Sequence, residues 1–341
     1  QPGPFFADGT RFTPAQGGLP AHCQVTGSYV TNPATGRTAN FLATFPENWN
    51  GKYLQLGCAG HCGTFAVSNP AMFTITITNQ GLPGDIIRKG YAAFATDQGH
   101  TVMTGGTWAS KGPGQVDDEA ITDFFWRASK VLTRFGKQFT SAFYAREAGA
   151  PAPISRSYFS GCSGGGRDAL VAASYFPEEF DGIIAGSPYA SDGRLFHLAG
   201  TTLAALRTPD AGISQPQLDL FNRTVTAQCD SVDGVKDGLI QNPAACNFRP
   251  ERDLPRCKGG EAAGQCFTPA QIETLSVVLT AVTDEADKIV GPAYAVSELQ
   301  NAFAPVAAPT ELQGDDPWPE ARGPQGGLWS LGYAGLKVFG Y

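Results

Sequence analysis

Residues 158–170 read YFSGCSGGGRDAL, and this stretch decides the fold. Within it, residues 161–165 match the G-x-S-x-G pattern, in which a serine lies on a sharp turn between a strand and a helix. An apolar run precedes the match, and RDALVAASYF follows it with apolar residues at helical spacing. Small residues on both sides let such a turn close so tightly that the serine hydroxyl projects alone. The context therefore predicts that Ser163 is a nucleophile, rather than one more serine in a glycine-rich loop.

A serine nucleophile needs N–H groups that hold the negative oxygen formed on its substrate. The backbone N–H of Gly164, at the start of the predicted helix, is one candidate. The second should come from a loop after an earlier strand, and GCAGHCG at residues 57–63 follows the apolar run YLQLG. Gly60 is the candidate donor in that loop. A turn closed by a disulfide between Cys58 and Cys62 is the structural alternative, and both interpretations can hold together.

The first 190 residues alternate strand and helix signals. Short apolar runs that end at Gly or Pro predict buried strands at residues 41–45, 53–57, 91–97, 157–161 and 182–188. From Asp118 to Phe139, apolar residues recur every three or four positions, which predicts one amphipathic helix with acidic residues in its first turn. Strands that alternate with helices indicate an α/β fold with a mostly parallel sheet. We expect this core to cover residues 1–189.

After Pro188 the pattern changes to helices separated by long loops that carry Cys and Pro. The capping boxes SQPQ, from Ser214, and TPAQ, from Thr268, each predict the start of a helix. We expect residues 190–341 to form a second, lid-like domain. Three of its aromatic residues are candidates either for a pocket that holds a flat acid or for the core of the domain: Phe196, Trp318 and Trp329.

The composition excludes several classes of function. Only 16% of the 341 residues are charged and the net charge is −7, so no basic field attracts nucleic acid or an anionic membrane. No apolar run is long enough to span a bilayer, and the chain opens on the polar stretch QPGPFFADGT. These features predict a soluble protein, from which any signal peptide has been removed, without nucleic-acid or membrane partners.

Eight cysteines are many for a protein of the reducing cytosol, and none lies in a C-x-x-C spacing. We therefore expect disulfides and an exported protein, extracellular or periplasmic. Cys229 with Cys246, and Cys257 with Cys266, would each close a short loop rich in turn residues. The pairing of the remaining four stays open: Cys23, Cys58, Cys62 and Cys162.

At the elbow the chain resembles the tannase and feruloyl esterase family, which includes the hydrolase of mono(2-hydroxyethyl) terephthalate. The resemblance is carried by residues 158–188, which continue the quoted stretch to FDGIIAGSP, by FATDQGH at residues 94–100 and by NWNGKYLQLG at residues 48–57. It extends from about Cys23 to the last residue. It implies a secreted α/β-hydrolase with a large inserted lid. Its implied reaction is cleavage of feruloyl, galloyl or terephthaloyl esters through a serine acyl-enzyme.

The resemblance also implies a catalytic Asp and His, with the cysteine before the nucleophile disulfide-bonded to a cysteine after that His. Cys162 and Ser163 match the first half of this arrangement, and the second half is not found. Only one histidine, His197, follows Ser163, and it lies too close to leave room for an Asp-bearing strand. We interpret His197 as a lid or hinge residue. The other three histidines precede the elbow: His22, His61 and His100. Of these, His100 is expected to fix a loop.

Three explanations account for the missing Asp and His. The segment that carries them lies on a separate, disulfide-linked C-terminal chain of the same precursor, or it is missing from this sequence, or it has been lost. In the third case the protein would be an inactive relative that binds aromatic or glycan ligands. A free thiol beside the elbow has no evident purpose, which favours a partner for Cys162 outside residues 1–341.

The stretch CDSVDGVKDGLI, residues 229–240, places three aspartates on one glycine-containing turn. Such carboxylates repel one another unless a cation lies among them, and hard oxygen ligands suit Ca²⁺. A solvated acidic turn is the alternative. The resemblance implies a structural calcium ion in the lid. The implied ligands are Asp230, Asp233, the Val235 carbonyl, Asp237 and the Leu239 carbonyl.

Overall fold

The computed structural model of the chain describes residues 5–63, 83–101, 107–112, 115–188, 207–262, 264–297, 311–313 and 320–322, with residues 197, 200, 201, 204, 205 and 299. Its internal contacts divide the chain into two compact units, Gln1–Ala190 and Ser191–Tyr341.

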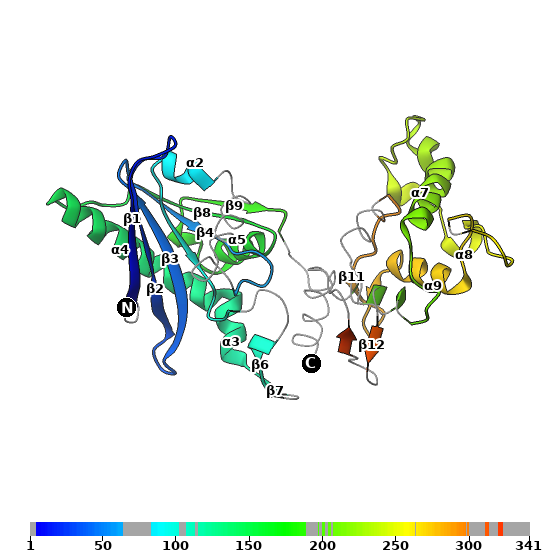
Figure 1. Cartoon of the computed structure of the whole chain (residues 1–341), viewed down its shortest axis with the longest axis horizontal. Helices are drawn as coiled ribbons and strands as arrows, with labels where there is room; N and C mark the ends of the chain where they lie inside the picture. Colours follow the sequence, from blue (N-terminus) through cyan, green and yellow to red (C-terminus); the bar gives the residue numbers. More distant parts are fainter. Residues whose placement is uncertain are drawn as a thin grey trace. The chain divides into compact units, whose positions relative to one another are not determined.

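A seven-stranded sheet forms the centre of the first unit, in the order β1-β2-β3-β5-β4-β8-β9 (Figure 1). The strands are β1 (Phe5–Thr13), β2 (His22–Asn32), β3 (Arg37–Pro46), β4 (Lys52–Leu56), β5 (Ala92–Thr96), β8 (Arg156–Cys162) and β9 (Gly182–Gly186). From β5 to β9 the neighbours are parallel, and from β1 to β5 they are antiparallel. All five predicted strands are present. The hairpin of β1 and β2 was not predicted, because β2 alternates buried and partly exposed residues and has no continuous apolar run.

Helices cover both faces of the sheet. On β4, Tyr53 lies in the cluster packed by α4 (Ala128–Ala148), whereas its neighbour Leu54 packs with Ile86 of α2 (Pro83–Arg88) on the other face. Successive side chains of a strand point to opposite faces, so this alternation is expected for a sheet buried on both sides. Helix α5 (Gly164–Tyr175) contacts β8 and β9 and also α4.

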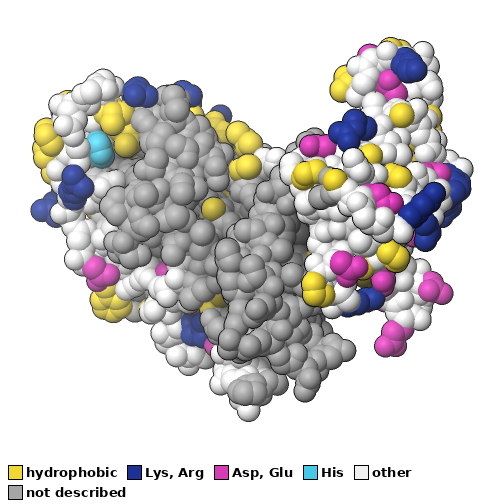
Figure 2. Space-filling view, turned by 45° about the vertical axis from the view of Figure 1, so that its right-hand side comes forward, with side chains coloured by type: hydrophobic (Ala, Val, Ile, Leu, Met, Phe, Trp, Pro, Cys, Tyr) yellow, Lys and Arg dark blue, Asp and Glu magenta, His cyan; other side chains and the backbone are white. Residues whose placement is uncertain are grey.

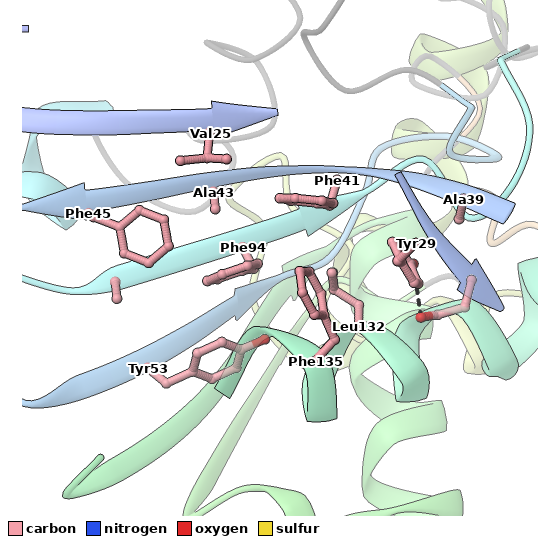
Figure 3. Close-up of a cluster of buried hydrophobic side chains, with 12 residues drawn as sticks. Val25, Tyr29, Ala39, Phe41, Ala43, Phe45, Tyr53, Phe94, Leu132 and Phe135 are labelled. Atoms are coloured by element: carbon pink, nitrogen blue, oxygen red, sulfur yellow. Dashed lines mark hydrogen bonds between the residues drawn. The ribbon is translucent and has the colours of Figure 1, made fainter. Parts of the chain in front are cut away.

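Aromatic rings fill the space between the sheet and α4 (Figure 3). Phe41 and Phe135 meet edge to face with ring centroids 5.1 Å apart, and Phe45 and Phe94 do so at 5.6 Å. Each buried ring of this size contributes roughly 2–3 kcal/mol to folding. The Tyr29 hydroxyl donates a hydrogen bond of 3.0 Å to the Ala128 carbonyl, so this large ring is buried without an unpaired polar atom. The rings thus fix α4 against the central strands of the sheet, and β4 among these pairs with β8, the strand that leads to the elbow.

The predicted helix begins at Asp118, as expected, but a wider turn interrupts it. α3 (Asp118–Thr122) leads into the π-helical turn η2 (Asp123–Arg127), and α4 then continues to Ala148. The Asp123 carboxylate is fully buried inside this turn and pairs with Arg127 at 2.6 Å and Arg37 at 3.2 Å. Two guanidinium groups offset the cost of burying this charge.

The described part of the first unit also contains short elements. They are η1 (Thr107–Ala109), the hairpin of β6 (Ser110–Gly112) and β7 (Gln115–Val116), and η3 (Pro177–Glu179). No helix in the described ranges is both long and apolar enough to cross a membrane. On the face drawn in Figure 2, basic and acidic side chains of the described residues are interspersed.

The described residues of the second unit form helices and short hairpins. The elements with described bounds are α7 (Gln215–Cys229), η4 (Asp230–Asp233), η5 (Pro243–Ala245), α8 (Pro250–Asp253), α9 (Pro269–Val278), β10 (Val282–Thr283), β11 (Ile289–Gly291), β12 (Glu311–Gln313) and β13 (Glu320–Arg322). Both predicted capping boxes are formed, at Ser214 and at Thr268. The two predicted disulfides are also formed, Cys229–Cys246 and Cys257–Cys266.

Candidate active site

Ser163 occupies the turn between β8 and α5. Its backbone adopts φ 59° and ψ −117°, which only glycine adopts without strain, and its side chain is exposed. A residue held in such a conformation costs about 1–3 kcal/mol. Two backbone hydrogen bonds hold it there: the Ser163 N–H donates to the Gly186 carbonyl, and the Arg167 N–H donates to the Ser163 carbonyl, both at 3.1 Å. These features are those of a nucleophile elbow.

The glycines around Ser163 have no space for a side chain. A Cβ atom on Gly161 would lie 1.9 Å from the Gly165 carbonyl oxygen, and one on Gly165 would lie 2.7 Å from that of Cys58. A Cβ atom on Gly164 would lie 2.2 Å from the carbonyl oxygen of Gly60. Contacts of this kind require bare backbone. The elbow is therefore packed directly against the loop that contains Gly60.

That loop, residues 57–63, is fixed at both ends and in its middle. The Gly57 N–H donates to the Ser160 carbonyl at 2.9 Å, and the Gly63 N–H donates to the Asp97 carbonyl at 3.1 Å. A disulfide joins Cys58 to Cys62, as one of the open pairings allowed. The loop therefore has little freedom to move its backbone N–H groups.

A buried ion pair follows the elbow in the first turn of α5. The Asp168 side chain is 2% exposed, and one of its carboxylate oxygens accepts a hydrogen bond of 2.6 Å from the Arg167 guanidinium. Its other oxygen lies 3.4 Å from the backbone nitrogen of Cys58 and 3.2 Å from the sulfur of that residue. Since Cys58 is in a disulfide, the sulfur is a contact only and the backbone N–H is the donor. We did not predict this pair, although both residues lie within the quoted stretch, because its partners are far away in sequence.

The guanidinium of Arg167 is enclosed by residues from two other elements. It lies over the Phe124 ring, 3.6 Å from the centroid, and donates hydrogen bonds of 3.2 Å to the Phe124 carbonyl and to the Gln98 side chain. A planar guanidinium is suited both to stacking on an aromatic ring and to pairing with a carboxylate. The pair thus connects α5 with the loop after β5 and with η2.

Asp97, directly after β5, is a further buried acid. Burial raises the pKa of Asp97 to about 6, although N–H groups of Gly99 and Asn40 donate to its carboxylate and oppose the shift. Its own backbone carbonyl receives the Gly63 N–H. Asp97 therefore links β3, the loop after β5 and the loop of residues 57–63.

All four histidines of the chain lie among the described residues. His22 lies with its Nδ1 atom 3.1 Å from the Pro20 carbonyl, and His100 stacks on Trp108 with ring centroids 4.1 Å apart. His61 is buried and meets Phe124 edge to face. His197 is fully buried, with its ring nitrogens 2.9 and 2.8 Å from the backbone carbonyls of Pro292 and Val277. These contacts give His197 a structural place in the second unit.

The acidic loop of the second unit folds by hydrogen bonds to its own backbone. Asp230 accepts from the N–H groups of Asp237 and Gly238, at 3.2 and 2.8 Å, and Asp233 accepts from those of Val235 and Gln241, at 3.0 and 3.1 Å. These last two bonds lower the pKa of Asp233. The loop thus carries carboxylate oxygens on Asp230, Asp233 and Asp237, a ligand type that suits Ca²⁺.

In the structure the aspartates of this loop are not grouped closely enough to coordinate one ion together. Two groups of His, Cys, Asp or Glu in the described ranges bring three ligand atoms within 4.8 Å of one another, and neither contains an aspartate of this loop. Both groups contain disulfide-bonded cysteines, which are not metal ligands: Cys58, Cys62 and Asp168, and Cys257, Glu261 and Cys266. The three aromatic residues predicted to line a pocket or to pack in the core of the second unit all lie outside the described residues: Phe196, Trp318 and Trp329.

The sequence model of the family described as tannase and feruloyl esterase matches residues 23–306. The chain belongs to this family. Curated relatives include a probable feruloyl esterase B-2 of Aspergillus flavus, 32% identical over 262 residues, which covers 75% of this chain and 45% of the relative. An uncharacterized esterase of Xanthomonas campestris is 35% identical over 263 residues, which covers 76% of this chain and 41% of the relative. The mono(2-hydroxyethyl) terephthalate hydrolase of Piscinibacter sakaiensis is 25% identical over 293 residues, covering 79% and 47%.

Solved structures share the fold of this tannase and feruloyl esterase family member. Feruloyl esterase B from Aspergillus oryzae superposes with a TM-score of 0.69 at 23% identity, covering 88% of this chain and 58% of that one. Tannin acyl hydrolase from Aspergillus niger superposes with a TM-score of 0.60 at 20% identity, and the match covers 95% of this chain and 59% of that one. The expected α/β-hydrolase fold is confirmed. The chain spans about half the length of the curated relatives it matches.

Proposed function

We propose that this chain carries the nucleophile and oxyanion hole of a serine carboxylic-ester hydrolase. The observation that carries the proposal is the strained backbone of Ser163 at the junction of β8 and α5, with its side chain exposed. Strain of this kind persists only where the surrounding structure holds it, and it gathers at functional sites. Membership of the family supports the same reaction class.

The oxyanion hole is proposed to consist of the Gly164 and Gly60 N–H groups. Gly164 begins α5, so its N–H has no partner within the helix. The Gly60 backbone lies directly against Gly164, on a loop held by a disulfide. Donors that are fixed before the substrate binds lower the barrier, because they need no reorganisation when charge develops.

The proposed reaction proceeds through an acyl-enzyme. The Ser163 oxygen bonds to the ester carbonyl carbon while its proton passes to a histidine base, and the negative carbonyl oxygen is held by the two N–H groups. When the ester C–O bond breaks, the base returns the proton to the departing alcohol. Water then attacks the acyl carbon with help from the same base, which releases the acid and restores Ser163.

The base and its aspartate are proposed to lie outside residues 1–341, near the Cys162 side of the elbow. Cys162 ends β8 and forms no disulfide with another described residue. β9 is the last strand of the sheet in the described part of the chain, and Ile184 on it is 67% exposed. An exposed apolar edge of this kind is suited to further polypeptide. A disulfide from Cys162 to that polypeptide would bring the base to Ser163; a peptide map under non-reducing conditions that gives Cys162 as a free thiol would contradict it.

We propose that the substrates are esters of aromatic acids. The support is the family and the names of two relatives, a probable feruloyl esterase and a mono(2-hydroxyethyl) terephthalate hydrolase. We further infer that the protein is exported, since three disulfides form within the described residues and such bonds persist in oxidising compartments. The second unit is proposed to act as the lid.

We propose a structural Ca²⁺ in the second unit, held by Asp230, Asp233, Asp237 and the carbonyls of Val235 and Leu239. The donor types support this assignment, and binding requires the three carboxylates to converge. The ion would stabilise the unit and would take no part in the ester chemistry.

Hydrolysis by the full-length natural polypeptide tests the proposed function. Methyl ferulate, methyl gallate and mono(2-hydroxyethyl) terephthalate are offered separately, and release of the acid is measured by chromatography. At least one should be cleaved, and Ser163→Ala should abolish the cleavage. If none is cleaved, or if Ser163→Ala retains the rate, the proposed function is wrong.

A further inference from the structure

Asp168 makes contacts that a helix residue does not need for its own fold. Its carboxylate reaches from the first turn of α5 to the backbone nitrogen of Cys58, 3.4 Å away and 110 residues distant in sequence. The same oxygen lies 3.2 Å from the Cys58 sulfur and 4.0 Å from the Cys62 sulfur. Asp168 therefore contacts both halves of the disulfide that closes the loop carrying Gly60.

The position of this carboxylate is fixed by Arg167. A buried carboxylate is strongly destabilising unless it is paired and hydrogen-bonded. The Arg167 guanidinium donates to it at 2.6 Å and is itself held by the Phe124 ring and carbonyl and by Gln98. Because Arg167 is anchored on other elements, Asp168 has a defined place from which to hold the Cys58 N–H.

We propose that Asp168 is a positioning residue of the oxyanion hole. Its carboxylate holds the loop of residues 57–63 against the first turn of α5, so that the Gly60 N–H lies beside the Gly164 N–H before the substrate arrives. The inference rests on the proposed function. Arg167 also acts electrostatically, because its positive charge neutralises the Asp168 carboxylate, which would otherwise repel the developing oxyanion.

The test is the Asp168→Asn variant of the full-length natural polypeptide. Asparagine keeps the shape and one acceptor oxygen but loses the charge that pairs with Arg167 and strengthens the bond from Cys58. Loss of a single oxyanion donor lowers kcat by about 100–1,000-fold, so a displaced donor should lower it by roughly 10–300-fold. KM for the ester should stay within about twofold, because the oxyanion is formed only in the transition state.

Active sites are counted by complete reaction with a fluorophosphonate, so that kcat refers to folded enzyme alone. The matched control is Asp123→Asn, which removes a carboxylate that is equally buried and paired with arginine but lies in η2. It should lower the melting temperature and leave kcat per titrated site unchanged. If Asp168→Asn behaves in the same way, Asp168 is a structural residue and the inference is wrong.

A second variant covers the case in which Asp168→Asn does not fold. Asp168→Glu keeps the carboxylate and displaces it by one methylene, so kcat per titrated site should fall with KM unchanged. An unchanged kcat in that variant overturns the inference. If the unmodified protein is active and either Asp168 variant matches it, only the inference fails, whereas an unmodified protein that neither hydrolyses esters nor labels at Ser163 overturns the proposed function as well.

Discussion

The backbone of Gly60 lies directly against that of Gly164, such that a Cβ atom on Gly164 would stand 2.2 Å from the Gly60 carbonyl oxygen. Gly164→Ala should therefore push the loop of residues 57–63 away from the elbow. We expect kcat to fall by about 100-fold or more and the free energy of unfolding to fall by about 1–3 kcal/mol.

Ester hydrolysis and urea unfolding measure the two effects. Gly212→Ala is the matched control, because the nearest atom to its added Cβ is 3.9 Å away, an ordinary contact. A Gly164→Ala enzyme with the activity of the control would refute the proposed oxyanion hole of Gly60 and Gly164.

The strained backbone of Ser163 gives a prediction for stability. At φ 59° and ψ −117°, glycine is unstrained whereas serine and alanine are not. Ser163→Gly should unfold with a free energy about 1 kcal/mol higher than Ser163→Ala, while both variants are inactive. Chemical denaturation of the two variants checks this difference. Equal stabilities would mean that the turn is relaxed in solution and that the elbow is not strained.

The raised pKa of Asp97, about 6 against an ordinary 3.8, predicts a pH dependence of stability. Because the folded protein binds this proton more tightly than the unfolded chain, the stabilising contribution is fully present below about pH 3.8. It is lost as the pH rises through 6, and its full size is about 3 kcal/mol. The free energy of unfolding of the unmodified protein, relative to Asp97→Asn, should therefore fall between pH 4 and pH 7.

The control for this titration is Glu119→Gln. Hydrogen bonds from Arg127 and Asn32 lower the pKa of Glu119, so the sign is opposite and its contribution is lost as the pH falls. The Glu119→Gln difference should therefore stay flat between about pH 5 and pH 7, where that for Asp97→Asn changes, and should change only below the ordinary pKa of 4.5. A flat difference for Asp97→Asn would contradict the burial assigned to that carboxyl.

Removal of calcium should destabilise the second unit. EDTA is expected to lower its melting temperature by several degrees, and added Ca²⁺ should restore it, because a ligand that binds only the folded state stabilises that state. Asp237→Asn should abolish the response. Asp284→Asn is the control, since Asp284 also accepts backbone N–H groups in an acidic turn, from Ala286 and Lys288. An unchanged melting curve, with no calcium found by elemental analysis, would refute the calcium site and favour the alternative, a solvated acidic turn.

Features that depend on neighbouring residues could be predicted from the sequence. The strand, tight turn and helix around Ser163 are encoded within residues 158–170, and both capping boxes lie within four residues each. Apolar residues recur at helical spacing from Ile272 to Val282, but helix α9 ends at Val278, because Val282 pairs with Gly291 in β10 and β11. Here a contact between strands outweighed the helical spacing.

Features that depend on distant residues could not be predicted. The contact of Asp168 with Cys58 joins segments 110 residues apart, and nothing in either segment indicates the other. The same holds for Asn40 and Asp97, whose hydrogen bonds link β3 to the end of β5. Apolar runs do not indicate the hairpin of β1 and β2, because β1 is exposed along nearly its whole length and β2 alternates buried and partly exposed residues.

The central claim is that Ser163 is the nucleophile, and labelling of the full-length natural polypeptide with a fluorophosphonate tests it most directly. Such a probe bonds to an activated serine, and peptide mapping by mass spectrometry identifies the residue. We predict one label per molecule on the peptide that contains Ser163, and none in Ser163→Ala. A folded natural polypeptide that remains unlabelled, or that is labelled at another serine, would contradict the account.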